Sequence, residues 1–528
     1  MANMAAKLSF AFVLAIILSV LGAWWLAYRY RAAMRTLMSA QGAGSAAVAH
    51  PLVSEPAPPP PAVRVVTASE NRRAAWILSA LLLALSLLIS ASTAALQHLF
   101  VFGTGDFSGK RIAVLVLMQV WPVVPLLGLV WRWSRARVLT VMVAWFGVSY
   151  LVMLWRSVTF EPGATLLGLA VEFGPPMLLI AALFMSNVTR AIAPWLFPLM
   201  LGFMSASLVG GGLLLLLIES NSSLLKALLG EIGATAVFVL AFVLPWAVAW
   251  WPLRWFGRAL SRAYVQKYLS ELGTLLTAVW GISLCYQWLS MSPEGPRSAA
   301  MLLPLFWIPL ALFIGWRLTR RESRPPTLLV LRVFQRDVQV QELFDTVIER
   351  WRPSGNTVLI AGTDLVDRTL GADDIFAFLD GRLATRFIRE PQEIAARIAA
   401  FDLRRDHDGR HRVNECYCHD RTWQAALSAL VQCSDVALMD LRGYQAHNAG
   451  CGHELGVLAR APRIARVVVL TDATTDRAAA DAAAAGAPPG RFVWLDTSRV
   501  DRRHARSVLQ HLFVPAPGGA RQAAPAGA

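Results

Sequence analysis

Charged residues are scarce in this sequence. Only 16% of its 528 residues are Asp, Glu, Lys or Arg, and 56% are hydrophobic, whereas about a quarter of a typical soluble protein is charged. The shortage is uneven, because apolar runs fill residues 8–316 and an ordinary polar mixture begins at Pro325. This distribution excludes a wholly soluble protein and indicates a membrane part followed by a soluble part.

Cysteine is also scarce. The five cysteines are too few for a disulfide framework, and four of them follow Pro325, which predicts reduced thiols in the cytosol. Cys416 and Cys418 would lie on one side of a strand, where one or two of His407, His411 and His419 could join them around zinc. The spacing matches no standard zinc finger, so we expect no metal and favour a strand with two thiols.

The excess of basic residues does not indicate a nucleic-acid partner. The formal net charge is +15, but many arginines flank apolar runs, where phospholipid attraction and membrane topology explain them. The lipid bilayer is therefore the expected partner, and nucleic acid is not. The sequence also lacks an internal repeat of the kind that secondary transporters contain.

Nine apolar runs approach the length of about 20 residues that a helix needs to cross a bilayer. They are Leu8–Tyr28, Ala75–Leu96, Ile112–Trp131, Val138–Trp155, Ala164–Met185, Ala191–Ile218, Glu231–Pro252, Leu272–Leu289 and Ala299–Trp316. Arg29, Arg31 and Arg35 follow the first run and no cleavage site is obvious. A retained anchor therefore fits this run better than a signal peptide.

Basic residues favour one orientation of these spans. If the N-terminus lies outside, the inside segments hold 18 Lys and Arg residues and the outside segments hold 6. This bias predicts a multi-pass protein of a bacterial inner (cell) membrane, with its N-terminus out and its C-terminal domain in the cytoplasm.

Composition divides the chain into five parts. A segment rich in Pro and Ala follows the first span and predicts an extended linker, and the C-terminal tail has a similar composition. The expected parts are an anchor at 1–35, a linker at 36–74, a multi-span domain at 75–324, a cytosolic domain at 325–514 and a disordered tail at 515–528.

One acidic residue lies inside a predicted span. Glu172 is followed by Pro175 and Pro176, which would break the helix locally, as in the discontinuous helices of transporters. Alternatively, Glu172 is protonated or paired within the bundle and the prolines only kink the helix. Glu172 is therefore a candidate polar site of the membrane domain, with both interpretations open.

From Thr327 onward, short β-rich runs alternate with helical ones. Strands are expected in "TLLVLRVF", "TVLIAG", "DVALMDL", "ARVVVLTD" and "RFVWLD", with a longer irregular segment at 389–420. Near-continuous apolar strands alternating with helices predict a sheet covered on both faces. The predicted fold is an α-helical polytopic membrane domain of about nine spans, followed by a cytosolic α/β domain with a mainly parallel, flavodoxin-like sheet.

Three loops would follow the carboxyl ends of these strands, where such sheets bind ligands. The third leads into a helix whose free N–H groups would suit an anion such as a nucleotide phosphate. The candidate nucleotide-binding residues are Phe334, Gln335, Arg336, Asp337, Thr363, Asp364, Asn448, Gly450, Cys451 and Gly452. Cys451 fits a small buried packing residue better than a nucleophile.

Residues 448–455, "NAGCGHEL", resemble a known pattern. Their Cys, Glu and Leu match the Toll/interleukin-1 receptor (TIR) domain pattern Ser-x-Trp-Cys-x-x-Glu-Leu, although Asn448 and Gly450 stand where it has Ser and Trp. Residues 450–456 are also similar to the Gly-x-x-x-Glu-Leu-Gly motif of nucleoside deoxyribosyltransferases. In enzymatic members of both groups the matching glutamate is catalytic, so the resemblance implies this role for Glu454.

That role has a chemical basis. A carboxylate beside the sugar would stabilise the positive charge that builds up as an N-glycosidic bond breaks, with NAD or a related nucleotide as substrate and no cofactor. Enzymatic TIR domains usually act as assemblies, which implies a homo-oligomer through the cytosolic domain. Alternatively, Glu454 is a solvated or capping residue in the first turn of its helix.

The resemblance implies an inner-membrane signalling or defence protein whose cytosolic domain binds or cleaves a nucleotide. Two alternatives stay open. One is a non-enzymatic membrane protein with a nucleotide-binding or self-associating regulatory domain. The other is a transporter with such a domain, for which Glu172 and its proline pair are the motivation.

Overall fold

The chain divides into two compact units. The computed structural model describes residues 2–39, 68–101, 108–156, 161–185, 199, 202, 205–206, 209–291, 296–319, 325–332, 347–361, 372–418, 422–497 and 502–513. The helical unit comprises Met1–Tyr30, Ala75–Leu318 and Leu370–Asp380, and the sheet unit comprises Arg31–Ala74, Thr319–Thr369 and Gly381–Ala528.

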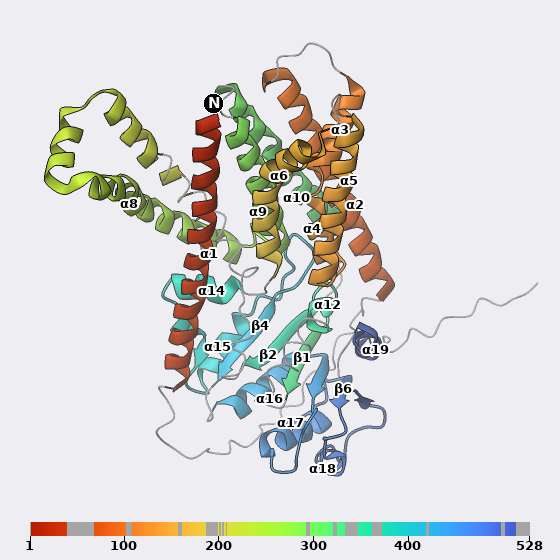
Figure 1. Cartoon of the computed structure of the whole chain (residues 1–528). Helices are drawn as coiled ribbons and strands as arrows, with labels where there is room; N and C mark the ends of the chain where they lie inside the picture. The colour runs from red at the N-terminus through yellow and green to blue at the C-terminus, as the bar shows by residue number, and fades with distance from the viewer. Residues whose placement is uncertain are drawn as a thin grey trace, which may run out of the picture. The chain divides into compact units, whose positions relative to one another are not determined.

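Long and short helices make up the helical unit (Figure 1). In chain order they are α1 (Ala2–Ser39, up to Tyr30), α2 (Ala68–Leu96, from Ala75), the π-helix η1 (Gln97–Val101), α3 (Gly109–Gln119), α4 (Val123–Val130), α5 (Arg135–Arg156), α6 (Pro162–Met185), α8 (Ser223–Val265), α9 (Glu271–Met291), the 3₁₀ helix η3 (Pro296–Phe306), α10 (Trp307–Thr319) and α14 (Ala372–Leu379).

Five helices of the described residues are long and apolar enough to cross a membrane. They lie at Arg72–Phe100, Arg135–Arg156, Pro162–Ala181, Ser223–Val265 and Arg297–Leu318. The bent pair α3 and α4 raises the number to six if it forms one span. The predicted count of nine is not confirmed. The first and eighth predicted spans lie in α1 and α9, which are helical but not among the five, and much of Ala191–Ile218 lies outside the described residues.

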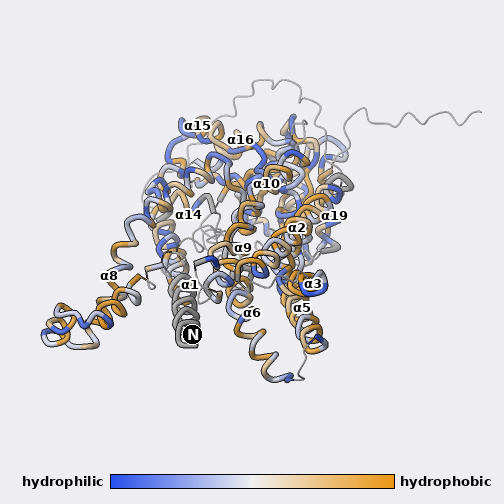
Figure 2. The backbone as a smooth tube through the Cα atoms, turned by 90° about the horizontal axis from the view of Figure 1, so that it is seen from above, coloured by the Kyte–Doolittle hydropathy of each residue, from blue (hydrophilic) through white to orange (hydrophobic). Residues whose placement is uncertain are grey.

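Helix α9 forms the centre of the helical unit. Leu275, Val279 and Leu284 on this helix have no exposed surface, and α9 packs against α4, α6 and η3. Figure 2 shows hydrophobic residues along α2, α5 and α10, whereas hydrophilic stretches surround α15 and α16 of the sheet unit. The apolar surfaces of the outer helices suit hydrocarbon rather than water as solvent.

The proline pair does not break its helix. Helix α6 continues from Pro162 to Met185 through Pro175 and Pro176, so the expected local break is absent. Discontinuities lie elsewhere: α8 is interrupted at Gly233, whose φ is 80°, and the axis bends by 50° between α3 and α4. Pro122 lies at this bend, where its ring and missing N–H oppose a continuous helix.

Seven parallel strands form the sheet of the sheet unit. They are β1 (Thr327–Arg332), β2 (Asn356–Ala361), β3 (Phe387–Ile388), β4 (Val413–Cys418), β5 (Val436–Asp440), β6 (Arg466–Thr471) and β7 (Phe492–Asp496), in the order β3-β4-β2-β1-β5-β6-β7. Every pairing is parallel. This confirms the predicted parallel sheet, and the run β2-β1-β5-β6-β7 has the flavodoxin-like order.

Helices cover both faces of this sheet. Leu329, Leu331 and Met439 belong to one core, to which α15 (Glu393–Ala399), α16 (Trp423–Cys433), α17 (Ala449–Arg460) and α18 (Arg477–Ala483) contribute. Because side chains alternate along a strand, Leu328 and Val330 face the other side. There α19 (Arg502–Leu512) packs on β5 and β6, and Trp351 of the short helix α12 (Glu349–Trp351) stacks on Phe513 at 5.6 Å.

The segment expected to be irregular contains regular elements. Residues 389–420 include α15 and the strand β4, which lies between β3 and β2. Four polar residues of the connection between them form ion pairs that leave little surface exposed: Arg410 with Asp408 at 2.8 Å and Arg412 with Asp406 at 3.1 Å. The charged residues that made this segment look irregular are therefore buried as pairs, and the strand expected at Cys416 and Cys418 is β4.

Candidate functional site

Glu454 lies on α17, directly after the loop that follows β5. It is the sixth residue of this helix and therefore lies in its second turn, and only 3% of it is exposed. The interpretation as a solvated or capping residue of the first turn is thus wrong. A buried carboxylate needs compensation or becomes protonated, so this position requires an explanation of its own.

The carboxylate of Glu454 is incompletely compensated. Its Oε2 is buried and has no hydrogen-bond partner among the described residues. Burial raises the pKa of Glu454 to about 8, and the positive charge of Arg332 opposes this rise. At neutral pH the free protein therefore holds Glu454 largely as the neutral acid, which a nearby cation would convert to the carboxylate.

Arg332 and Asp440 place Glu454 in the sheet topology. Arg332 is the last residue of β1, Asp440 is the last residue of β5, and the two are register partners. Strands β1 and β5 are where the strand order reverses direction, because β2 follows β1 on one side and β5 lies on the other. Such a switch point is where open parallel sheets bind ligands beyond the carboxyl ends of their strands.

Asp440, by contrast, has its charge compensated by a neighbour. The Arg442 guanidinium donates two hydrogen bonds to it, from Nε to Oδ1 at 2.8 Å and from an Nη atom to Oδ2 at 2.7 Å. Both residues are buried. This bidentate pair fixes the start of the β5–α17 loop, so the loop reaches α17 on a rigid support.

The loop after β6 holds the β5–α17 loop from the other side. Asp472 accepts hydrogen bonds from the Gly443 amide at 3.0 Å and from the Thr475 hydroxyl at 3.0 Å. Burial tends to raise the pKa of Asp472, but these hydrogen bonds and those from Thr474 outweigh it and lower that pKa. Gln445 adds a bond from its amide to the Thr474 carbonyl at 2.6 Å. These hydrogen bonds join the β5–α17 loop and the loop after β6 into one ordered structure beside Glu454.

The N-terminus of α17 is less open to an anion than expected. The amides of Cys451 and Gly452 donate to the Asn448 carbonyl at 3.0 and 3.3 Å, and the Ala449 amide donates to His447. The Asn448 side chain accepts from the Gln445 amide at 2.8 Å rather than capping the helix. Several donors that a phosphate would use are therefore already engaged. The nucleotide-binding roles of Asn448, Gly450, Cys451 and Gly452 stay predictions.

An aromatic side chain lies beside the start of α17. Trp423, the first residue of α16, contacts the His453 ring edge-on with 5.6 Å between ring centroids. A Cβ placed on Gly450 would lie 3.9 Å from the Trp423 ring, so a glycine leaves this ring close to the backbone. Burial and the Arg460 charge lower the pKa of His453, which keeps its imidazole neutral at neutral pH.

The cysteines are packing residues in this structure. Cys451 is buried in the hydrophobic core, where burial, with a smaller contribution from Glu454, raises the pKa of its thiol to about 12. Cys416 and Cys418 pack against the same core, and burial raises the pKa of Cys416 to about 12. No three His, Cys, Asp or Glu residues of the described part are grouped to hold a metal ion, and His419 lies outside that part.

Two of the three predicted loops lie outside the described residues. They carry Phe334, Gln335, Arg336 and Asp337 in one case and Thr363 and Asp364 in the other. The strands that lead into them, β1 and β2, are adjacent in the sheet and end on the same edge as β5. The nucleotide-binding roles of the residues in these two loops stay predictions.

Sequence reasoning missed Arg332, Asp440 and Trp423. Arg332 is the one charged letter in the run "TLLVLR", and Asp440 ends the run "VALMD". A charged residue at the carboxyl end of an otherwise apolar strand is a usable signal for the ligand edge of a parallel sheet. Trp423 had no such signal, because it becomes part of the site only through the packing of α16 beside α17.

The helical unit holds a second polar cluster. Gln119 at the end of α3 donates a hydrogen bond from its side-chain amide to Gln97 of η1 at 3.0 Å. Both are buried, as is His98 beside Gln97. Glu172 is separate from this pair: it is partly buried on α6, where the neighbouring Val171 carbonyl accepts a hydrogen bond from the Tyr286 hydroxyl. Polar groups buried among apolar helices are costly and often mark a pathway or a binding site.

No protein-family model, curated protein or solved structure matches this chain.

Proposed function

We propose that this chain is a signalling or defence protein of a bacterial inner membrane whose sheet unit is a TIR-like domain that cleaves the N-glycosidic bond of NAD or a related nucleotide. One observation carries the proposal. A carboxyl group with a buried oxygen that has no hydrogen-bond partner among the described residues lies at the topological switch point of a parallel sheet, beside the Arg332 charge. This is the position where such sheets bind nucleotides.

The electrostatics suit the reaction. The nicotinamide ring of NAD is cationic, so a ligand that places it near Glu454 favours the ionised carboxylate. As the bond from the ribose to nicotinamide breaks, positive charge moves onto the sugar, and the same carboxylate stabilises it. Water then adds to the ribose, giving nicotinamide, ADP-ribose and a proton. Arg332 would attract a phosphate of the nucleotide.

The test uses the full-length protein reconstituted at high density in lipid vesicles, because the resemblance implies assembly. Nicotinamide release from NAD is compared between the wild type, Glu454→Gln and Glu393→Gln. Glu393 begins α15 of the same unit and its carboxylate already accepts the Arg389 amide at 2.8 Å, so it is a matched control. We expect Glu454→Gln to lower release at least about 100-fold and Glu393→Gln to leave it unchanged.

Other outcomes select the alternatives. No release from any variant, together with a thermal shift of the wild type by NAD that Glu454→Gln alters, would replace cleavage with a nucleotide-binding regulatory domain. No release and no thermal shift would overturn the nucleotide proposal. Equal release from the wild type and Glu454→Gln would remove Glu454 from the catalytic role.

The proposed topology has nine spans, the N-terminus outside and the C-terminal sheet unit in the cytoplasm. The positive-inside bias of the sequence supports this orientation, and the helices long enough to cross a membrane support a membrane location. A fluorescent-protein fusion at the C-terminus is expected to fluoresce, because this reporter folds in the cytosol. A periplasmic reporter fused at the same place is expected to be inactive.

A transporter with a regulatory domain is the second candidate. The buried Gln97–Gln119 pair beside the break between α3 and α4 favours it, since transporters bind substrates at discontinuous helices. Uptake of a solute that is lost in Glu172→Gln or Gln119→Leu and kept in Glu454→Gln would support transport. Loss of nicotinamide release in Glu454→Gln with unchanged uptake would assign the two activities to separate units.

A further inference from the structure

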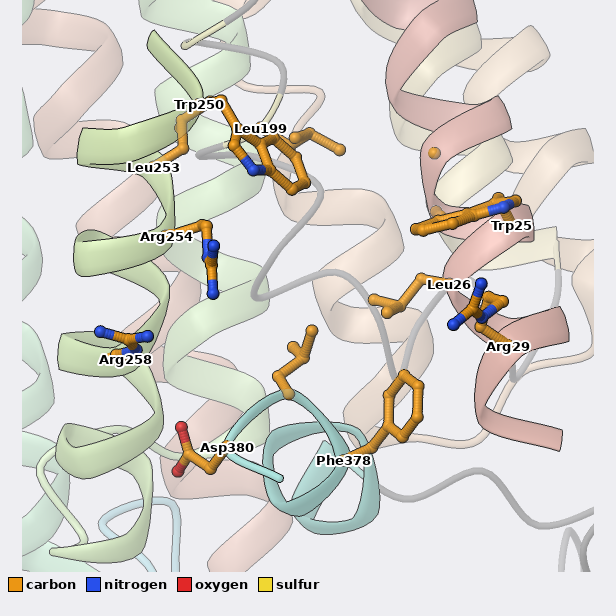
Figure 3. Close-up of a pocket in the computed structure, with 13 residues that line it drawn as sticks. Trp25, Leu26, Arg29, Leu199, Trp250, Leu253, Arg254, Arg258, Phe378 and Asp380 are labelled. Atoms are coloured by element: carbon orange, nitrogen blue, oxygen red, sulfur yellow. The ribbon is translucent and has the colours of Figure 1, made fainter. Parts of the chain in front are cut away.

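A pocket of about 420 Å³ lies within the helical unit, between α1, α8 and α14. Figure 3 shows Trp25, Leu26 and Arg29 on one side of it and Trp250, Leu253, Arg254 and Arg258 on the other, with Phe378 and Asp380 of the α14 region below. This volume is within the range of small-molecule sites in proteins. It is built from four segments that are distant in the sequence, the fourth being represented by Leu199.

The lining changes from apolar to basic in the same order along both helices. On α8, Trp250 and Leu253 precede Arg254 and Arg258, and the spacing of four places Trp250, Arg254 and Arg258 on one face. On α1, Trp25 and Leu26 precede Arg29 by about one turn. The pocket therefore has an apolar end and a cationic end, which suits an anionic amphiphile.

The cationic end is not neutralised from within. The lining includes Arg29, Arg254 and Arg258 against the single carboxylate of Asp380, which leaves a net charge of +2. Asp380 accepts a hydrogen bond from the Ser261 hydroxyl at 2.8 Å. Within the described part of the chain Arg254 and Arg258 form no ion pair, and Arg29 lies over the Trp25 ring at 5.5 Å. Two guanidinium groups are thus available to a phosphate.

The exposed surface of α8 around the pocket indicates that the ligand comes from the membrane. Helix α8 is one of the helices long and apolar enough to cross a membrane, and Trp250, Trp251 and Trp255 are exposed along it. Exposed tryptophans followed by arginines mark the boundary between hydrocarbon and headgroups. A pocket that is apolar toward the tryptophans and basic beyond them matches a phospholipid, with its acyl chain and headgroup in the same order.

We propose that this pocket binds an acidic phospholipid, with the phosphate between Arg254, Arg258 and Arg29 and the acyl chain along Trp250, Leu253 and Leu26. A zwitterionic headgroup would bring a second cation to the arginines, so net negative charge on the lipid is the selected property. The proposal does not depend on the activity of the sheet unit.

The test is native mass spectrometry of the full-length protein released from micelles that contain phosphatidylglycerol or phosphatidylcholine. We expect the wild type to retain phosphatidylglycerol at least about tenfold more strongly than phosphatidylcholine, and Arg254→Gln with Arg258→Gln to lose this preference. Arg135→Gln with Arg137→Gln is the matched control, because these arginines begin α5 and lie outside the pocket. Arg254→Lys with Arg258→Lys keeps the charge and is expected to keep part of the preference.

Three results would overturn the proposal. The first is equal retention of the two lipids by the wild type, a comparison that needs no variant. The second is an equal loss of preference in the α5 control, which would reduce the effect to general surface charge. The third is competition by free glycerol phosphate as effective as that by the lipid, which would assign the arginines to a soluble phosphate.

Discussion

The two units distribute their side chains in opposite ways. In the sheet unit, all five residues of β5 are buried. In the helical unit, Leu178 of α6 is 73% exposed and Trp251 of α8 is 79% exposed, whereas Ser86 and Ser90 of α2 are fully buried. A unit that exposes large hydrophobic residues and buries hydroxyls is built for hydrocarbon, where polar groups turn inward. The sheet unit buries its apolar strands, as proteins in water do.

The largest expected effect concerns buried charge in the sheet unit. Arg442→Met removes the partner of Asp440, and because the uncompensated carboxylate stays buried, we expect a loss of about 3–5 kcal/mol in the free energy of unfolding of this unit. Arg442 is 1% exposed and Asp440 is 5% exposed. Hydrogen exchange of the β5 and β6 amides in the full-length protein measures this loss.

Two controls define that result. Asp481→Asn removes an ion pair with Arg477 whose side chains are about half exposed, so it should cost less than about 0.5 kcal/mol. Replacing both Arg442 by Met and Asp440 by Leu should restore much of the stability, because no unpaired charge is left. A double variant as unstable as the single one would show that the pair is needed for its geometry rather than for charge compensation.

A matched pair of leucine substitutions tests the comparison directly. Leu438→Ala in β5 deletes a side chain with no exposed surface and is expected to destabilise the sheet unit by about 2–5 kcal/mol. Leu178→Ala in α6 deletes a largely exposed side chain and is expected to change the stability of the helical unit in detergent by less than about 0.5 kcal/mol. Hydrogen exchange of β5 and of α6 reports both. A large loss from Leu178→Ala would place this surface in a protein interface.

The third prediction concerns Glu454 and pH. Its pKa is about 8 in the folded protein and 4.5 as an ordinary glutamate, so the folded state binds more protons between these values. The stability that this group contributes is therefore present below about pH 4.5 and is lost as the pH rises through about 8. Glu454→Gln removes this dependence and should stabilise the sheet unit by about 1–3 kcal/mol at pH 9.

Urea unfolding at pH 5 and at pH 9 checks this prediction, with Glu393→Gln as the control. The wild type and Glu454→Gln are expected to agree at pH 5 and to differ at pH 9, where the wild type is less stable. A variant that is less stable than the wild type at pH 9 would mean that the ionised carboxylate is stabilised in the folded protein. That result would also contradict the inference that Glu454 is a neutral acid in the free protein and becomes ionised when a cationic ligand binds.

Sequence reasoning performed differently on the two units for physical reasons. The alternation of apolar strands with helices predicted the parallel sheet, since burial on both faces leaves a direct hydropathy signal. Sequence reasoning placed Cys416 and Cys418 in a strand, which is β4. It left the rest of that segment irregular, because charged residues that pair when buried, such as Arg412 and Asp406, look polar in the sequence. In the helical unit, apolar length alone cannot locate the bend between α3 and α4. Pro175 and Pro176 suggested a break, but α6 continues through both residues.

In the candidate site, too, the sequence revealed the local features and missed those that depend on the fold. The motif around Glu454 is local in sequence and was found, but its burial was not, because the helix begins at Ala449 and so places Glu454 one turn further in than expected. Arg332 comes from a strand more than a hundred residues earlier and meets Glu454 only through the β1–β5 pairing. A local sequence motif cannot reveal residues that are brought together by the pairing of distant strands.

The smallest expected effect is the loss of stability when a helix-capping side chain is removed, and it differs between the first residues of α17 and α18. Asp476 caps α18, where its side chain accepts the Ala479 amide at 3.0 Å, whereas Asn448 at the start of α17 makes no such bond to its helix. Asp476→Ala should therefore cost about 1 kcal/mol. Asn448→Ala loses only the loop bond to Gln445 and should cost less. Hydrogen exchange of α17 and α18 measures both losses. If Asn448→Ala costs more than Asp476→Ala, the β5–α17 loop depends on Asn448 for its conformation. The loop structure beside Glu454 is then stabilised by the Asn448 side chain rather than by Asp472.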